Sequence, residues 1–140
     1  MGIDLSYNLL RLAQNKFRIP VLQANITELP FRENSFDAVW AIASLLHLSK
    51  HEIEKALKEI RRVLRPEGVF ISSMKEGAGE SSDSRSRHFA YYTSEEWGSI
   101  LSSSGFQILD CNTSVEKRMA DEPHNNSFIT WIVCLAKSGK

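Results

Sequence analysis

The stretch Leu57–Ile71, LKEIRRVLRPEGVFI, joins the clearest helix pattern of this chain to a strand pattern. Before Pro66, apolar residues recur at steps of three and four, the spacing that puts side chains on one face of a helix. These residues are Ile53, Ala56, Leu57, Ile60, Val63 and Leu64. Pro66, Glu67 and Gly68 end the helix and turn the chain into the apolar run VFISSMK. The stretch therefore predicts a helix that packs against a β-sheet.

Two short motifs predict where helices begin. Ser49 with Glu52, and Thr93 with Glu96, match the S/T-x-x-E capping box, in which both side chains satisfy backbone N–H groups of the first helical turn. Gly105 follows the second of these helices as its expected C′ residue.

Upstream of residue 49, strand and helix patterns alternate. Strands are expected at GIDL (2–5), PVLQANI (20–26) and FDAVWAIASLL (36–46). The third is almost continuously apolar, as expected for a central strand that is covered on both faces. The helix between the first two strands covers 7–17 and is capped by Ser6. Its expected buried face carries Leu9, Leu10, Ala13 and Phe17.

Downstream of the strand at 69–75, the segment 75–89 is rich in Gly and Ser and has no periodicity, so we expect a mobile surface loop. It is a candidate lid or a passive loop. The strands at 106–115 and 127–137 are joined by polar residues 116–126 without a helix, and should pair antiparallel. Together the patterns predict one α/β domain over 1–140, a doubly wound, mostly parallel sheet with an antiparallel C-terminal strand.

Composition excludes several classes of protein. The 140 residues carry 17 cationic and 17 acidic side chains, so net charge gives no reason to expect nucleic acid or an anionic membrane as partner. No apolar run reaches about 20 residues, and no signal peptide is visible. The cysteines, Cys111 and Cys134, form no framework or metal-binding spacing. We expect a cytoplasmic protein with two buried thiols and no metal site, with a disulfide as the alternative.

In combination these residues resemble the class I S-adenosylmethionine-dependent methyltransferases, in particular the type 11 group. The motifs that carry the resemblance are GIDLS (2–6), LPF with SFDAVWA (29–41) and LKEIRRVLRPEGVF (57–70). The resemblance implies a Rossmann-like sheet and methyl transfer from S-adenosylmethionine to a small-molecule acceptor. Absence of the Asp-Pro-Pro-Tyr and Pro-Cys types of motif argues against methylation of DNA adenine or cytosine C5.

The resemblance also implies cofactor-binding residues. Asp4, followed by Leu5, matches the acid that binds the ribose hydroxyls; the alternative is that Asp4 caps the following helix together with Ser6. Asn25 and Ile26 match the adenine turn, although the family usually has Asp at the first position. The methionine moiety is expected near Ala41 and its two neighbours, Trp40 and Ile42. Trp40 has a core role as its alternative, and Trp97 and Trp131 are expected in the core.

The family's Pro-Gly-Gly turn is Pro66, Glu67 and Gly68 here, and Glu67 carries no cost if Gly68 alone adopts positive φ. The family's first strand, which ends in an acidic, glycine-rich motif, has no counterpart in this sequence. The resemblance therefore implies an N-terminally truncated sheet with an unpaired edge on each side of the missing strand. The strands at 2–5 and 36–46, which are the second and fourth strands of the family, could pair directly. Alternatively, a partner chain could complete the sheet, or the fragment could fold poorly. We favour self-association into a homo-oligomer.

Candidates for a general base are His47, His88 and Tyr91, because all three flank the expected substrate edge of the sheet. For His47 the alternative is a packed histidine at the strand–helix junction, the commoner role for a histidine without a visible orienting partner. A second hypothesis is a non-catalytic or partner-requiring remnant that does not bind cofactor by itself. A third is another nucleotide-binding Rossmann protein that uses Asp4 on a ribose.

Overall fold

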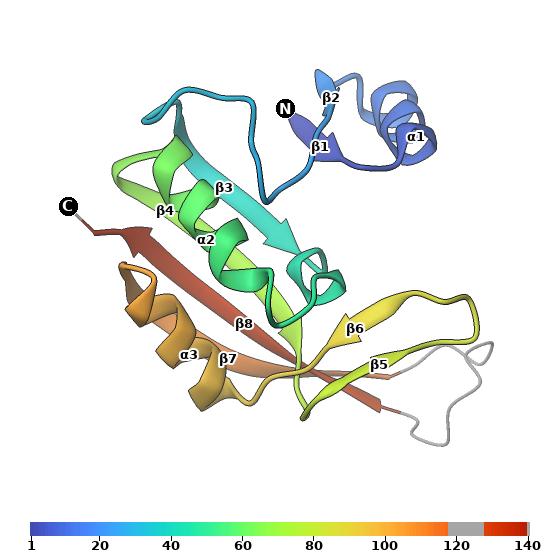
Figure 1. Cartoon of the computed structure of the whole chain (residues 1–140), viewed down its shortest axis with the longest axis vertical. Helices are drawn as coiled ribbons and strands as arrows, with labels where there is room; N and C mark the ends of the chain where they lie inside the picture. Colours follow the sequence, from blue (N-terminus) through green and yellow to red (C-terminus); the bar gives the residue numbers. More distant parts are fainter. Residues whose placement is uncertain (118–127, 140) are drawn as a thin grey trace.

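The computed structural model describes residues 1–117 and 128–139, so most of the polar connection at 116–126 lies outside the described residues. The elements alternate as the sequence predicted, with one additional hairpin and one short 3₁₀ helix (Figure 1). In chain order they are β1 (Gly2–Asp4), α1 (Tyr7–Phe17), β2 (Val21–Gln23), β3 (Phe36–Ile42), η1 (Leu45–His47), α2 (Ile53–Val63), β4 (Leu64–Lys75), β5 (Glu80–Ser82), β6 (His88–Ala90), α3 (Ser94–Ser103), β7 (Phe106–Lys117) and β8 (Phe128–Ser138).

The larger sheet has the order β3-β4-β8-β7. Strands β3 and β4 are parallel, whereas β8 pairs antiparallel with both β4 and β7. This confirms the predicted α/β fold class and the antiparallel terminal strands. Strands β1 and β2 form a separate parallel pair, and β5 and β6 a separate antiparallel hairpin.

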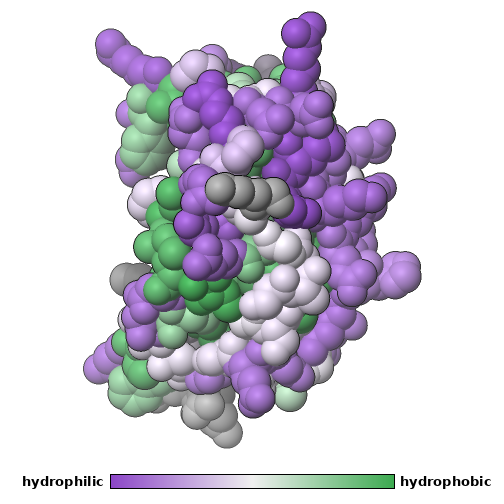
Figure 2. Space-filling view, turned by 90° about the vertical axis from the view of Figure 1, so that its left-hand side faces the viewer, coloured by the Kyte–Doolittle hydropathy of each residue, from purple (hydrophilic) through white to green (hydrophobic). Residues whose placement is uncertain are grey.

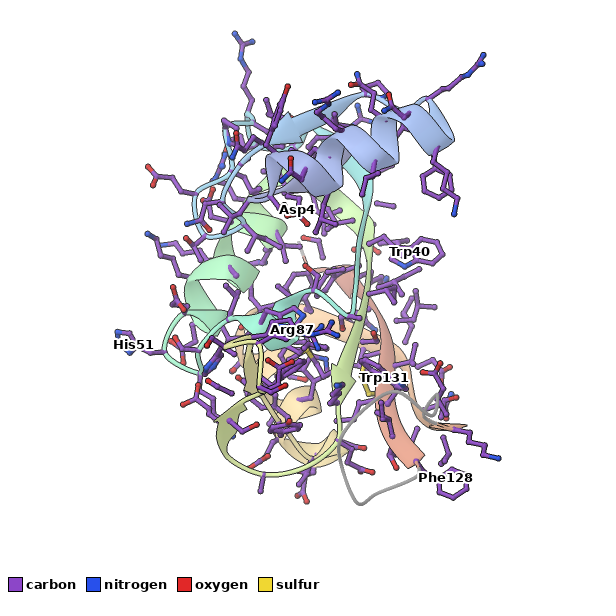
Figure 3. All side chains as sticks on the ribbon, turned by 90° about the vertical axis from the view of Figure 1, so that its right-hand side faces the viewer. Asp4, Trp40, His51, Arg87, Phe128 and Trp131 are labelled. Carbon is purple, nitrogen blue, oxygen red and sulfur yellow. A yellow bond between two sulfur atoms is a disulfide. The ribbon has the colours of Figure 1, made fainter. Side chains whose placement is uncertain are left out.

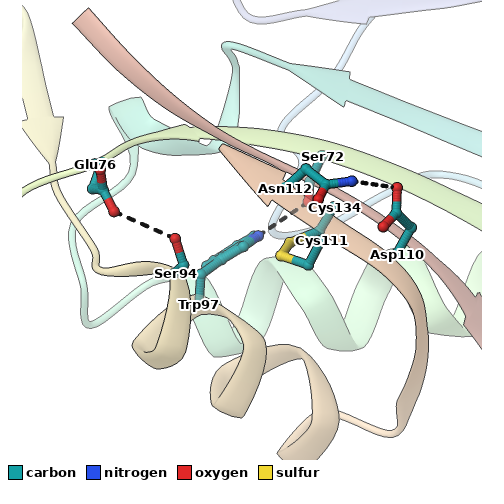
Figure 4. The surroundings of a disulfide bond; sticks show 8 residues. All are labelled: Ser72, Glu76, Ser94, Trp97, Asp110, Cys111, Asn112 and Cys134. Atoms are coloured by element: carbon teal, nitrogen blue, oxygen red, sulfur yellow. Dashed lines mark hydrogen bonds between the residues drawn. A yellow bond between two sulfur atoms is a disulfide. The ribbon is translucent and has the colours of Figure 1, made fainter. Parts of the chain in front are cut away.

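The core lies between the larger sheet and helices α2 and α3, which cover the same face (Figure 1). Phe70 and Met74 of β4 are fully buried there together with Leu57 of α2 and Trp97 of α3. The Trp97 indole N–H donates to the Ser72 hydroxyl at 3.1 Å, so this buried polar pair is satisfied (Figure 4). The apolar face of α2 around Leu57 therefore packs against the sheet, as its spacing predicts.

The opposite face of the larger sheet is open, contrary to the expectation that the strand at 36–46 is covered on both faces. Side chains alternate along β3, so Val39 and Ala41 join the core while Trp40 and Ile42 point the other way and are 74% and 44% exposed. Figure 3 shows Trp40 projecting away from the ribbon, and Figure 2 shows hydrophobic residues gathered along one margin of the surface. The apolar run also stops being a strand at Ile42.

Helix α1 does not bury the face that its sequence predicted. Ser6 caps it as expected, its hydroxyl accepting from the Leu9 N–H at 3.4 Å. Of the apolar residues, only Leu10 is buried, whereas Leu9 and Phe17 are 55% and 62% exposed. The physical reason is that α1 packs on β1 and β2, three-residue strands that form too narrow a surface to cover a whole helix face.

The segment 75–89 is an ordered hairpin rather than the irregular loop that its composition predicted. The turn between β5 and β6 is organised by Asp83, whose carboxylate accepts the backbone N–H groups of Arg85 and Arg87, both at 2.9 Å. The Arg87 guanidinium also donates to it at 2.7 Å. Hydrogen bonds from Arg87 and Arg85 lower the pKa of Asp83 to about 2. Sequence periodicity missed this turn because its strands have three residues each.

The turn at Pro66 differs from its expected conformation. At the Pro66 turn, Glu67 has the positive φ, 62°, and Gly68 does not, so the expectation for these two residues is wrong. Gly68 is required for a different reason, because a Cβ there would lie 2.8 Å from the Arg65 carbonyl oxygen.

The two predicted capping boxes differ. Thr93 and Glu96 form a complete box, and Gly105 has the positive φ expected after α3. Glu52 reaches back to the Ser49 N–H at 3.1 Å, but it is itself the N-cap residue of α2, and the Ser49 hydroxyl donates to the Glu52 carboxylate. Only half of that box is present.

Cys111 and Cys134 form a disulfide across β7 and β8, so the expectation of two free thiols is wrong and the alternative holds (Figure 4). The cause is register, since the two residues lie directly opposite each other in adjacent antiparallel strands. Among the described residues, no helix combines the length and apolarity needed to cross a bilayer.

Candidate functional site

The carboxyl ends of β3 and β4 lie next to each other and turn the chain over the edge of the sheet. The residue after β3, Ala43, has the left-handed φ of 51°. Its backbone N–H donates to the Ser73 hydroxyl of β4 at 2.9 Å, which holds this unusual conformation. Helix η1 follows at once and carries His47 above the strand ends. The continuous apolar run had predicted a strand through residues 43–46, so this turn was not expected.

A cavity of about 340 Å³ opens at this edge. Its apolar walls come from three separate segments, so they meet only in the folded chain; they are Ala43, Leu46, Phe89, Ile129 and Trp131. Trp131 was expected in the core; it is half-buried, packs against the core and also borders this cavity. Its indole N–H donates to the Glu116 carboxylate at 2.8 Å. The size is in the usual range of small-molecule sites.

His47 borders this cavity and has an orienting partner that the sequence did not reveal. Its Nδ1 lies 2.8 Å from the carbonyl oxygen of His88, 41 residues further along the chain. A carbonyl oxygen can only accept a hydrogen bond, so Nδ1 carries the proton and Nε2 of the neutral ring carries a lone pair. The ring also packs 4.9 Å from that of Phe89. This is the tautomer that a general base using Nε2 requires.

The side chains of the other two base candidates turn toward strand β5. Nε2 of His88 lies 3.2 Å from the Glu80 carboxylate, and the Tyr91 hydroxyl lies 3.1 Å from that of Ser81. Neither side chain lines the cavity beside His47. The structure thus brings only His47 of the three to this cavity, and His88 contributes through its carbonyl group.

Lys75, at the end of β4, is held among the aromatic walls of the same cavity. Its ammonium lies 4.4 Å from the ring centroid of Phe89 and 5.7 Å from that of Trp131. The Arg87 guanidinium lies 5.4 Å from the Phe89 ring centroid. Such cation–π contacts fix the position of a charge in a partly apolar site.

Asp4 ends β1 and is half-buried. Its Oδ1 accepts the Ser6 N–H at 2.7 Å, so the capping role considered as an alternative is present. Its Oδ2 has no hydrogen-bond partner among the described residues and can still accept from a sugar hydroxyl. Leu5 is 63% exposed, and its carbonyl accepts from the Gln23 side chain at 2.8 Å. Figure 3 shows Asp4 beneath α1.

The remaining cofactor candidates lie on both sides of a gap between β1 and β3. Asn25 forms an Asx turn by accepting the Thr27 N–H at 3.0 Å. Ile26 and Ala41 line a cavity of about 320 Å³ in the gap, together with Ile3 of β1 and Trp40 of β3. Among the residues that the structure describes, β1 pairs only with β2, and β3 only with β4. Direct pairing between the strand of Asp4 and that of Trp40, one of the three expected outcomes, is therefore wrong.

Comparison with known proteins identifies relatives of this arrangement. Residues 1–72 match the family model described as a methyltransferase domain. The Encephalitozoon cuniculi protein ECU09_1500, which carries a methyltransferase name, is 32% identical over 143 residues, covering 86% of this chain and 68% of that protein. The Bacillus subtilis methyltransferase YodH is 31% identical over 120 residues, which cover 81% of this chain but only 50% of YodH.

Solved structures share the fold at lower identity. A SAM-dependent methyltransferase from Methanosarcina mazei superposes with a TM-score of 0.81 at 19% identity, over 99% of this chain and 81% of that one. The 1,6-didemethyltoxoflavin-N1-methyltransferase of Burkholderia thailandensis, solved with its substrate and S-adenosylhomocysteine, gives a TM-score of 0.76 at 22% identity, over 99% and 60% of the two chains.

Proposed function

This chain belongs to the methyltransferase domain family, and on that premise we propose that it transfers a methyl group from S-adenosylmethionine to a small-molecule acceptor. The observation that carries the proposal is the placement of Asp4 at the end of β1 and of His47 on η1, just beyond the end of β3. Asp4 has a carboxylate oxygen without a hydrogen-bond partner among the described residues, and His47 has an oriented imidazole. The chain covers 68% of the length of ECU09_1500 and 50% of that of YodH. The activity of a whole protein of that length is therefore also a proposal.

The residues present fit part of the cofactor. Asp4 offers Oδ2 to a ribose hydroxyl while Oδ1 holds the start of α1, which keeps the carboxylate in place. Asn25, fixed by its own turn, presents its amide beside Ile26, whose apolar side chain suits an adenine ring. The methionine end would lie toward Ala41, where the described residues supply no glycine-rich backbone.

When bound, S-adenosylmethionine supplies a methyl carbon whose bond to the positively charged sulfur breaks, with its electron pair staying on sulfur, as the acceptor's lone pair forms the new bond. In our proposal His47 uses Nε2 to take the proton of a hydroxyl acceptor, and the His88 carbonyl stabilises the resulting imidazolium through Nδ1. Leu46 and Phe89 exclude water beside the reacting groups. The main contribution of the protein is alignment.

Calorimetric titration with S-adenosylmethionine tests the proposal. Asp4→Asn keeps an oxygen for the Ser6 N–H but removes the negative charge, and should weaken binding by about tenfold or more. Asp110→Asn, an exposed acid on β7, is the matched control and should bind like wild type. Equal affinity of the wild type and both variants would show that Asp4 does not bind the cofactor. No heat at millimolar cofactor would contradict autonomous binding.

The gap between β1 and β3 favours a second candidate, a chain that binds cofactor only when another polypeptide segment completes the sheet. Both facing strand edges lack partners among the described residues, and apolar side chains line the space between them. Self-association is the simplest source of such a segment. Light scattering should then report a dimer or larger, which Trp40→Glu on the open face should dissociate; a folded wild-type monomer that binds cofactor would contradict this candidate.

A further inference from the structure

We propose that Glu80 is the positioning residue of the His47 site, an inference that rests on the proposed use of His47 as a base. Glu80 is the first residue of β5, and its hydrogen bonds go to neighbours of His47 rather than to the imidazole. Its carboxylate ties the β5–β6 hairpin to the loop that follows η1. It thereby keeps the His47 ring next to the carbonyl group that orients it.

A single oxygen of Glu80 makes both of these contacts. Its Oε1 accepts the backbone N–H of Lys50, three residues after His47, at 2.7 Å. The same oxygen lies 3.2 Å from Nε2 of His88. An ionised carboxylate can only accept hydrogen bonds, so this Nε2 carries a proton. The carbonyl oxygen of His88 in turn accepts the Nδ1–H of His47 at 2.8 Å. Glu80 therefore binds both the residue that orients the imidazole and the chain that carries it.

Helix η1 depends on such outside support. Its three residues form one 3₁₀ turn, the form of helix with the poorer hydrogen-bond geometry. The backbone ladder between β5 and β6 lies within the hairpin and does not reach η1. Hydrogen bonds from His47 to the His88 carbonyl and from Lys50 to Glu80 join the two segments. Loss of the second would leave the first without support, and the His47 ring would then sample both tautomers.

Glu80 acts through hydrogen-bond geometry more than through its charge. Its side chain is 40% exposed, so solvent screens the effect of the charge at a distance. The two contacts of Oε1 need only an acceptor in the right place, which the amide oxygen of glutamine also provides. Glutamine at this position should therefore keep the function of Glu80, whereas alanine should lose it.

Nitrogen-15 NMR of the whole chain, at a pH where histidine is neutral, tests this inference. In Glu80→Ala the ratio of the Nδ1–H to the Nε2–H tautomer of His47 should fall about three- to tenfold, the range of one net hydrogen bond. Glu80→Gln should retain the wild-type ratio. An unchanged ratio in Glu80→Ala would overturn the inference. An equal fall in both variants would contradict the hydrogen-bond mechanism.

Glu52→Ala is the matched control. Glu52 lies in the same loop and accepts the Ser49 N–H at 3.1 Å and the Ser49 hydroxyl at 2.7 Å. Among the described residues, these hydrogen bonds stay within the loop. Their loss should leave the tautomer ratio of His47 unchanged. A fall as large as that in Glu80→Ala would show that any loosening of the loop has this effect, which would overturn the specific role of Glu80. Circular dichroism confirms that each variant is folded.

Calorimetry of S-adenosylmethionine on the same samples separates the two proposals. Glu80 lies outside the residues expected to hold the cofactor, so its variants should bind cofactor like wild type. Cofactor binding with an unchanged tautomer ratio in Glu80→Ala would contradict the positioning role and leave the proposed function standing. A changed ratio without cofactor binding in any of the proteins would contradict the proposed function, and Glu80 would then orient a histidine with another role.

Discussion

His47 Nδ1 lies 2.8 Å from the carbonyl oxygen of His88, so the backbone of the β5–β6 hairpin fixes the imidazole of η1. This contact joins two segments that sequence analysis treated separately, the histidine after the third strand pattern and the Gly/Ser-rich segment. Because a carbonyl oxygen can only accept a hydrogen bond, the contact also places the proton of the neutral ring on Nδ1.

The first prediction is that the neutral His47 ring is the Nδ1–H tautomer. Nitrogen-15 NMR at a pH where histidine is neutral should show a protonated Nδ1 and an unprotonated Nε2, because the His88 carbonyl can only accept. His51, which is exposed and serves as the control, should show the mixture typical of a solvated ring. An Nε2–H signal for His47 would contradict the proposed base.

The second prediction concerns the buried pair of Ser72 and Trp97. Ser72→Ala leaves the indole N–H without an acceptor in the core, and should lower the free energy of unfolding by about 1–3 kcal/mol. Urea denaturation measures the change. In a Trp97→Phe background the same substitution should cost clearly less, and an undiminished cost would mean that Ser72 acts through another contact.

The third prediction concerns the turn after Arg65. Glu67→Gly should raise the free energy of unfolding by up to about 1 kcal/mol, because glycine adopts the φ of 62° without strain. Loss of the surface ion pair between Glu67 and Lys137 limits the gain. Gly68→Ala should instead destabilise by about 2 kcal/mol, since its Cβ meets backbone oxygens of Arg65 and Asp37. The opposite order of the two effects would refute this account.

The fourth prediction concerns Tyr92, whose buried hydroxyl has no hydrogen-bond partner among the described residues. Burial, helped by Glu80 and Glu96, raises its pKa to about 12. Its contribution to stability is therefore complete below pH about 10, the unfolded value, and is lost as the pH rises toward 12. Tyr92→Phe should be as stable as wild type or up to about 1 kcal/mol more stable at neutral pH, and should lack this part of the alkaline loss. Tyr7→Phe, at a 60% exposed position, should retain it.

The fifth prediction is an acid transition of the hairpin. The pKa of Asp83 is lowered to about 2 in the folded chain, whereas it is near 3.9 in the unfolded chain. The stabilisation by its hydrogen bonds is therefore complete above pH about 3.9 and is lost as the pH falls through about 2. The amide NMR signals of Arg85 and Arg87 should therefore titrate together near pH 2. In Asp83→Asn they should not titrate; a midpoint near 4 in wild type would show that the turn is not held by Asp83.

Local signals in the sequence determined most of the secondary structure. The three- and four-residue spacing around Leu57, the Thr93–Glu96 box and the glycine at 105 depend on interactions within a few residues, so they could be interpreted without knowing the fold. The family motifs likewise placed Asp4 at the end of a strand, where the structure has it.

Tertiary structure alone decided which surfaces meet. Apolar spacing could not show that Leu9, Phe17 and Trp40 remain exposed, because burial depends on a second element being present to cover them. Register between β7 and β8 decided the disulfide. The cavity of His47, Lys75 and Trp131 draws on residues far apart in the chain, and only folding brings their charges and rings within interaction distance.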